Sequence, residues 1–124
     1  MSADAFFPEP VEIDAYGNGG FRFGEMSHKG SLLILPSGVY GWAYSVFEDV
    51  DETAFAAVFD QSDTIPFLLF GTGEVQQFPT AQVSNRFMDE NISLEVMDTG
   101  AAARTFNILL NEGRDVAAAL LAVD

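Results

Sequence analysis

The chain has 124 residues, of which 48% are hydrophobic, and this is enough for one globular domain with a substantial core. Nineteen acidic residues against five Lys and Arg give a formal net charge of −14, which repels nucleic acid phosphates and anionic lipid headgroups, so we expect no nucleic acid partner and no direct membrane insertion. Because the sequence has no cysteine, disulfides, thiolate metal sites and cysteine nucleophiles are excluded.

The N-terminus carries no targeting pattern. It is acidic, and it shows neither the basic region of a secretory signal nor the Arg-rich amphipathic pattern of a transit peptide. Apolar runs such as residues 116–123 are too short to span a bilayer. We therefore expect a cytoplasmic protein in which residues 1–10, with Pro8 and Pro10, form a flexible arm and residues 11–124 form one domain.

Two β-hairpins are predicted in the N-terminal half. Gly17-Asn18-Gly19 and Pro36-Ser37-Gly38 have the composition of tight turns, in which Gly and Asn supply the positive φ angles. The predicted strands around these turns are residues 11–16 with 20–24, and residues 31–35 with 39–46. Residues 26–30 are predicted to be a turn with His28 on the surface.

Strands alternate with helices in the C-terminal half. The apolar periodicity predicts helices at residues 51–59, 80–90 and 99–112, and strands at residues 66–70, 92–97 and 116–123. This order implies parallel strands joined by right-handed crossovers. We predict an α/β fold: a single three-layer domain in which the N-terminal hairpins extend or cover a small mixed, partly parallel sheet, with helices packed on its other side.

The triplet Asp98-Thr99-Gly100 is the one that carries the catalytic carboxylate in aspartic proteases. A protease needs two such carboxylates on loops between strands. Here Ala101-Ala102-Ala103-Arg104 follows, and Ala102, Phe106, Leu109 and Leu110 share one stripe of a helix. We therefore interpret Asp98 or Thr99 as a helix cap and not as a catalytic group.

The same helix has a polar face. Arg104, Asn107 and Asn111 are spaced i, i+3 and i+7, which places them on one side. They form either a solvated face, with Arg104 paired to one of the many acids, or a polar binding site. Gly113 is predicted to end the helix as a left-handed cap.

Two further features have a structural and a functional interpretation. Gly71-Thr72-Gly73 follows a buried strand and forms either a sharp turn or a place where backbone N–H groups approach an anion. His28 is the only histidine, and no second His or Cys completes a metal set, so we predict no metal site and no cofactor.

Several segments together resemble one known family. They are "YGNGGFRF" (16–23), "GSLLILP" (30–36), "FLLFGTG" (67–73) and "EVMDTGAAARTFNILLNEGRDVAAALL" (95–121). The resemblance covers about residues 12–122 and is to small α/β proteins of unknown biochemical activity. That family includes the mitochondrial respiratory complex I (NADH dehydrogenase) assembly factor 3 and an adipogenesis-associated domain protein, with many bacterial and archaeal members.

The resemblance implies a three-layer α/β fold but no catalytic residue. The family often has Cys where this chain has Ala103, so no thiol-dependent activity carries over. The positions that match the family and line a possible site are Gly71, Gly73, Asp98, Thr99, Arg104, Thr105, Asn107, Glu112 and Arg114. Thr72 and Asn111 complete the predicted binding set.

Two functional hypotheses follow. The first is a non-enzymatic interaction or assembly protein, with another protein as its partner, that supports biogenesis of a respiratory membrane complex. The second is a small-molecule or anion binder, or an enzyme, that uses a crevice at the carboxyl ends of the parallel strands near Gly71–Gly73 and Arg104. We favour the first because the sequence shows no nucleophile–base pair.

Overall fold

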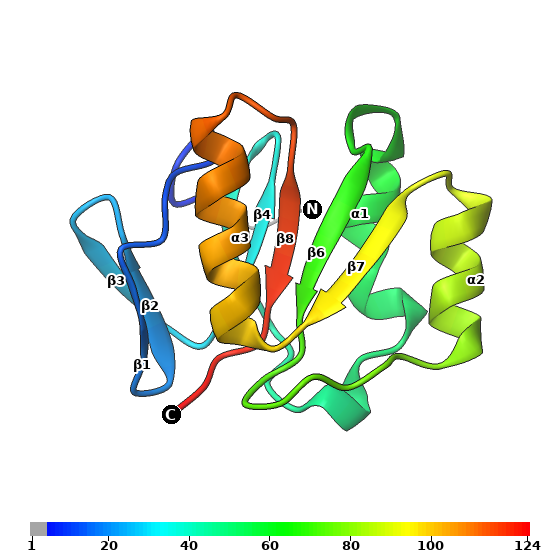
Figure 1. Cartoon of the computed structure of the whole chain (residues 1–124), viewed down its shortest axis with the longest axis horizontal. Helices are drawn as coiled ribbons and strands as arrows, with labels where there is room; N and C mark the ends of the chain where they lie inside the picture. Colours follow the sequence, from blue (N-terminus) through cyan, green and yellow to red (C-terminus); the bar gives the residue numbers. More distant parts are fainter. Residues whose placement is uncertain (1–4) are drawn as a thin grey trace.

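The computed structural model describes residues 5–124 and contains two sheets. A three-stranded antiparallel sheet has the order β1-β2-β3, and a five-stranded sheet has the order β5-β4-β8-β6-β7 (Figure 1). The strands are β1 (Ala15–Gly17), β2 (Gly20–Phe23), β3 (Met26–Lys29), β4 (Ser31–Leu35), β5 (Gly38–Trp42), β6 (Phe67–Gly71), β7 (Ser93–Met97) and β8 (Ala117–Leu120).

Three α-helices and three short 3₁₀ turns connect these strands. They are η1 (Phe47–Asp49), η2 (Glu52–Phe55), α1 (Ala56–Asp60), η3 (Ser62–Thr64), α2 (Ala81–Asp89) and α3 (Thr99–Asn111). The predicted helix at 51–59 is thus a 3₁₀ turn that continues as an α-helix. Asp51 caps it by accepting a hydrogen bond from the Thr53 N–H at 3.0 Å, as Thr80 caps α2. Gly113 ends α3 with a φ of 77°, which confirms the predicted left-handed cap.

The five-stranded sheet is mixed, as predicted. Strand β4 is antiparallel to both β5 and β8, whereas β6 is parallel to both β7 and β8. The chain therefore leaves β6 through α2 to reach the sheet edge at β7, and it returns through α3 to β8 on the other side of β6. These observations confirm the α/β fold class.

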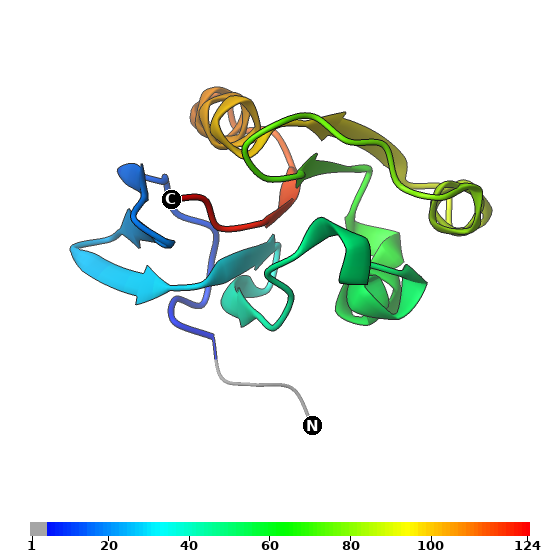
Figure 2. The ribbon, with the colours of Figure 1, turned by 90° about the horizontal axis from the view of Figure 1, so that it is seen from below.

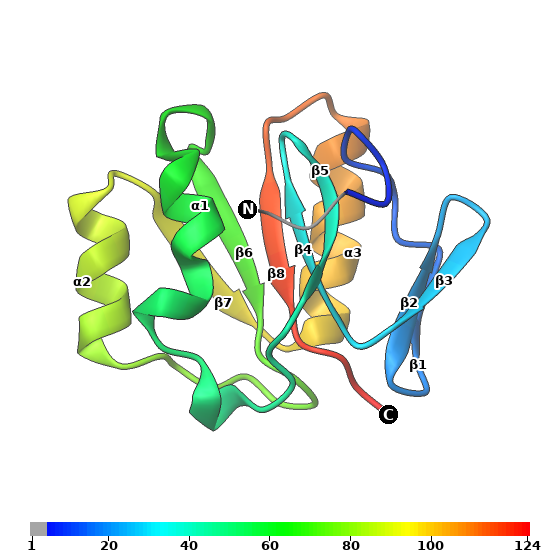
Figure 3. The ribbon, with the colours of Figure 1, turned by 180° about the vertical axis from the view of Figure 1, so that it is seen from behind.

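The placement of the helices differs from the prediction. Figures 2 and 3 show α1 against one face of the five-stranded sheet, with α2 beside α1 at the β7 edge, and α3 against the opposite face. The three-stranded sheet shares its core with α3, so the hairpins and a helix cover the same face. The right-handed crossover rule explains this placement, since a connection that moves outward and one that moves back put their helices on opposite faces.

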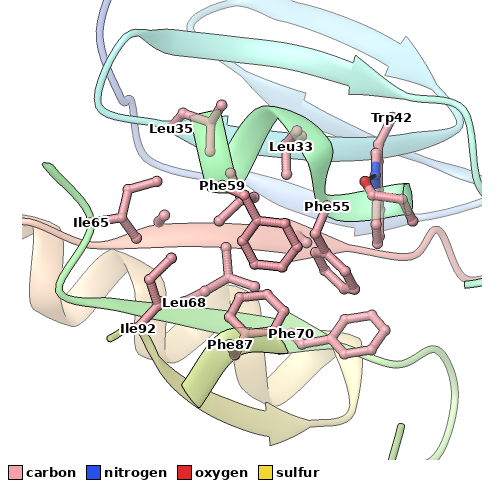
Figure 4. Close-up of a cluster of buried hydrophobic side chains, with 14 of the residues drawn as sticks. Leu33, Leu35, Trp42, Phe55, Phe59, Ile65, Leu68, Phe70, Phe87 and Ile92 are labelled. Atoms are coloured by element: carbon pink, nitrogen blue, oxygen red, sulfur yellow. Dashed lines mark hydrogen bonds between the residues drawn. The ribbon is translucent and has the colours of Figure 1, made fainter. Parts of the chain in front are cut away.

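Alternating side chains divide the core into two clusters. Leu33, Leu68 and Phe70 point to the face of α1 and α2, where Phe55, Phe59 and Phe87 meet them (Figure 4). Their neighbours on the same strands point to the α3 side, where they pack against Phe21, Phe23, Ala102 and Phe106. A strand that is apolar at every position is therefore buried on both faces, which accounts for the continuous apolar run of β6.

The N-terminal hairpins are confirmed, but the predicted turn at residues 26–30 is wrong. The turn is Gly24-Glu25, both with positive φ, and Met26–Lys29 is strand β3. His28 therefore lies in a strand, half-buried, with its ring 4.9 Å from that of Phe6. Three predicted strands overlap the observed ones only in part: 11–16 meets β1 at residues 15–16, 39–46 meets β5 at residues 39–42, and 116–123 meets β8 at residues 117–120.

The boundary of the predicted N-terminal arm remains a prediction. Residues 1–4 lie outside the described residues. Beyond them, the Phe6 N–H donates to the Val39 C=O at 2.7 Å and the Val39 N–H donates to the Phe7 C=O at 3.1 Å, so this segment pairs with β5. Within residues 5–124, no helix has the length and apolar character needed to cross a bilayer.

Candidate functional site

The carboxyl ends of β6 and β7 meet the start of α3, where an α/β sheet of this kind binds its ligands. The Thr99 hydroxyl accepts a hydrogen bond from the Gly73 N–H at 3.0 Å and donates one to the Leu121 C=O at 2.7 Å. The Thr99 N–H donates to the Gly73 C=O at 2.9 Å, and the Leu121 N–H donates to the Gly71 C=O at 2.9 Å. Thr99 thus ties the β6 turn to the segment after β8.

Thr72 is buried in the same turn and makes hydrogen bonds to both sides of it. It is 1% exposed, and its N–H donates to the Met97 C=O at 2.9 Å. Its hydroxyl donates to the Val75 C=O at 2.7 Å and accepts from the Gln77 N–H at 3.0 Å. The N–H groups of Thr72 and Gly73, which we considered as anion donors, are therefore both engaged within the chain.

Each residue of the Asp98-Thr99-Gly100 triplet has a structural role. The Asp98 carboxylate accepts a hydrogen bond from the Ala101 N–H at 2.9 Å, so it is the N-cap of α3. Thr99 is fully buried and makes the contacts described above. A Cβ at Gly100 would lie 2.6 Å from the Tyr16 hydroxyl, so glycine leaves room for that ring. The triplet begins a helix, as the sequence predicts.

The predicted polar face of α3 exists, and it binds the chain's own segment 12–16. Asn107 accepts a hydrogen bond from the Ile13 N–H at 2.8 Å and donates one to the Ile13 C=O at 2.8 Å. One turn away on either side, Arg104 donates to the Tyr16 hydroxyl at 2.6 Å and Asn111 donates to the Glu12 carboxylate at 2.9 Å. These three side chains hold residues 12–16, which include the start of β1, along the length of the helix.

The predicted site residues form separate groups. Gly71, Thr72, Gly73, Asp98 and Thr99 come together at the strand ends. Arg104 lies five residues after Thr99, about 140° around the helix, so it points away from that group, and it is exposed. Thr105 points a third way, into a hollow beside Phe67, Leu109 and Arg114. The second functional hypothesis places Arg104 and the Gly71–Gly73 turn at one crevice. The geometry of the helix does not bring them together.

Sequence reasoning missed the partners of these residues. Ile13 and Leu121 take part through backbone groups, which leave no trace in side-chain patterns. The sequence pattern places Tyr16 in a strand, but it does not show that the tyrosine hydroxyl accepts a hydrogen bond from Arg104. Within residues 5–124, no three His, Asp or Glu side chains are grouped so that they could hold a metal ion.

The comparisons with known proteins agree on a family. A family model described as a protein of unknown function (DUF498/DUF598) matches residues 13–121. The NADH dehydrogenase [ubiquinone] 1 alpha subcomplex assembly factor 3 of Rattus norvegicus is 32% identical over 115 residues, which are 93% of this chain and 62% of that protein. The chain therefore spans less than two thirds of the length of that relative.

Two bacterial proteins match over more of their own length. An uncharacterized protein of Rhodobacter capsulatus is 38% identical over 93% of this chain and 87% of its own. A crystal structure from Bartonella henselae, of a protein described as an outer membrane protein, superposes with a TM-score of 0.90. It is 46% identical and covers 95% of this chain and 99% of that one. These matches confirm the resemblance and the fold.

Proposed function

The chain belongs to the DUF498/DUF598 family of proteins of unknown function, and from this membership we propose that it is a non-enzymatic interaction protein that supports assembly of a respiratory membrane complex. The observation that carries the proposal is the 32% identity to an assembly factor of NADH dehydrogenase, which extends over 93% of this chain. Because the matched part is a whole folded domain, the two proteins can share a binding surface.

The geometry at the strand ends supports an interaction role over a ligand-binding one. The backbone N–H groups of Thr72 and Gly73 and the hydroxyl of Thr99 are hydrogen-bonded within the chain. An anion that bound there would have to break these hydrogen bonds. Each buried donor or acceptor that is left unpaired costs about 1–3 kcal/mol. This arrangement favours a rigid scaffold that presents its outer surface.

The proposal places the protein in the cytoplasm, where it meets subunits before or during their insertion into a membrane complex. The chain's charge of −14 suits a partner with basic segments. Arg104 is exposed and holds its hydrogen bond to Tyr16 at the surface, so it is a candidate contact for an acidic side chain on that partner.

Deletion of the gene in the cells that encode the protein tests the proposal. We expect less of the assembled NADH dehydrogenase complex, measured on native gels and by NADH oxidation in membranes, and accumulation of partly assembled forms. Re-expression of the wild-type chain restores the complex, and a control with an unrelated acidic protein does not. An unchanged amount of complex and unchanged intermediates in the deletion strain would contradict the assembly role.

A further inference from the structure

The two edges of the five-stranded sheet differ. At the β5 edge, Phe6 and Phe7 pair with Val39, so both backbone groups of that residue are engaged. At the other edge lies β7, which ends the strand order; α2 stands beside it, and a hollow lined by both elements lies between them (Figure 1). An uncovered edge strand offers free N–H and C=O groups to another strand, and natural proteins usually protect such edges.

The free groups of β7 follow from its pairing with β6. The Ser93 N–H donates to the Pro66 C=O at 3.1 Å, and the Met97 C=O accepts from the Thr72 N–H at 2.9 Å. In a parallel pair every second residue bonds to the same neighbour, so Leu94 and Val96 direct their backbone groups outward. The Gln76 side chain donates to the Val96 C=O at 2.9 Å. Within residues 5–124, no hydrogen bond outside the strand pairing engages the Leu94 N–H, the Leu94 C=O or the Val96 N–H.

Hollows lie on both faces of this edge. The hollow on the α2 side has a volume of about 660 Å³, and its walls include Phe78, Met88 and Leu94. The hollow on the α3 side has a volume of about 350 Å³, and its walls include Phe67, Met97 and Arg114. A strand that pairs with β7 points successive side chains to opposite faces, and thus into the two hollows alternately.

The side chains around the larger hollow are unusually exposed. Phe78 and Met88 are each 72% exposed, which is more than any other large hydrophobic residue among those described. Phe78 precedes α2 and Met88 lies in its last turn, so both stand on the helix side of the β7 edge. Exposed apolar groups beside free backbone donors and acceptors are the two features that strand addition uses.

We propose that β7 is a docking edge for an extended segment of a partner protein, which adds a strand to the five-stranded sheet. Large apolar side chains of that segment fill the hollow beside Phe78 and Met88. The alternate side chains lie over Phe67 and Met97. This inference rests on the proposed function in one respect, since it takes the segment to belong to a protein that the chain binds.

Charge favours a basic partner segment over a second copy of the chain. Glu95 is exposed at the centre of β7, and it lines the smaller hollow together with Arg114, with which no ion pair is formed among residues 5–124. A Lys or Arg beside Glu95 on the added strand gains a charge pair. In two copies paired antiparallel through Leu94 and Val96, the two Glu95 side chains would face each other, and both chains carry −14.

Selection from a displayed library of short linear peptides tests the docking edge with the purified full chain. We expect selected peptides to alternate apolar residues with other types and to be rich in Lys and Arg. Met88→Glu, which places a charge in the larger hollow, should weaken their binding by about tenfold or more. The matched control is Ile108→Glu on the outer face of α3, where the side chain is 59% exposed, and it should leave binding unchanged.

Amide hydrogen exchange on the chain with its selected peptide gives the residue-level readout. The Leu94 and Val96 amides should slow, while those of Ser93 and Met97, on the β6 side, should change little. Peptides without alternation, equal binding by Met88→Glu, unchanged exchange at Leu94 and Val96, or a dimer of the chain joined at β7 would each overturn the docking edge. Because peptide binding is measured without the respiratory complex, its failure is distinguishable from failure of the deletion experiment.

Discussion

The Asn107 side chain on α3 binds both backbone groups of Ile13, accepting from its N–H at 2.8 Å and donating to its C=O at 2.8 Å. The Asn107 side-chain amide thus makes the same kind of hydrogen bonds to Ile13 that a neighbouring strand would make, and Ile13 is only 5% exposed. The polar face of α3 thus holds the start of the three-stranded sheet in place.

Asn107→Ala should destabilise the protein more than its neighbours on the same face. It leaves the buried N–H and C=O of Ile13 unpaired, which should lower the free energy of unfolding by about 2 kcal/mol or more. Asn111→Ala removes only an exposed contact with Glu12 and should cost about 0.5 kcal/mol or less. Urea unfolding of both variants measures the difference, and equal losses would contradict the role of Asn107.

Substitutions at Asp98 separate a helix cap from a catalytic carboxylate. Asp98→Asn should keep most of the stability, because Asn also caps, whereas Asp98→Ala should lose about 1 kcal/mol. Thermal unfolding of the two variants checks this order. Peptide cleavage by the wild-type chain that disappears in Asp98→Asn would show the capping interpretation to be incomplete.

Much of the fold could be predicted from residues whose own chemistry marks a helix end or a turn. Asp98 before a run of alanines, Thr80 before α2 and Gly113 after α3 mark helix ends by side-chain chemistry and φ preference. Gly17-Asn18-Gly19 marks a hairpin for the same reason. These local rules hold because they involve only a few neighbouring residues.

The parts that could not be predicted depend on distant contacts. Met26–Lys29 has little apolar alternation, and it forms β3 because the Gly24-Glu25 turn and the partner β2 position it. The place of β8 between β4 and β6 puts α3 on the hairpin side, and nothing local to β8 indicates that order. The role of Asn107 was hidden because its partner is the backbone of Ile13, 94 residues away.

Acid should weaken the start of η2. Hydrogen bonds from Thr53, above all from its side chain, hold the pKa of Asp51 below its usual value. A carboxyl whose pKa is lower in the folded state stabilises the protein above its unfolded pKa, about 3.9, and loses that contribution as the pH falls through the folded pKa. Thermal unfolding between neutral pH and pH of about 3 should therefore show a smaller acid-induced loss in Asp51→Asn than in the wild type.

The matched control for this pH effect is Asp63→Asn, which removes another exposed carboxylate. It should leave the acid-induced loss of stability as large as in the wild type. An Asp51→Asn variant with the wild-type pH profile would mean that the contact with Thr53 does not stabilise the folded state.

The net charge predicts that the protein alone does not bind polyanions. At near-physiological salt it should neither retard DNA in a gel nor sediment with protein-free vesicles of anionic lipids. Direct sedimentation with such vesicles would contradict the expectation that membrane association needs a protein partner.

The most direct test of the assembly role is affinity capture of the tagged full chain from its own cells, with membrane and soluble fractions compared after mild cross-linking. We predict that subunits or assembly intermediates of the NADH dehydrogenase complex are enriched with the wild-type chain, that Met88→Glu reduces this enrichment, and that Ile108→Glu does not. Capture of no subunit of that complex from either fraction, in cells that assemble it normally, would contradict the account.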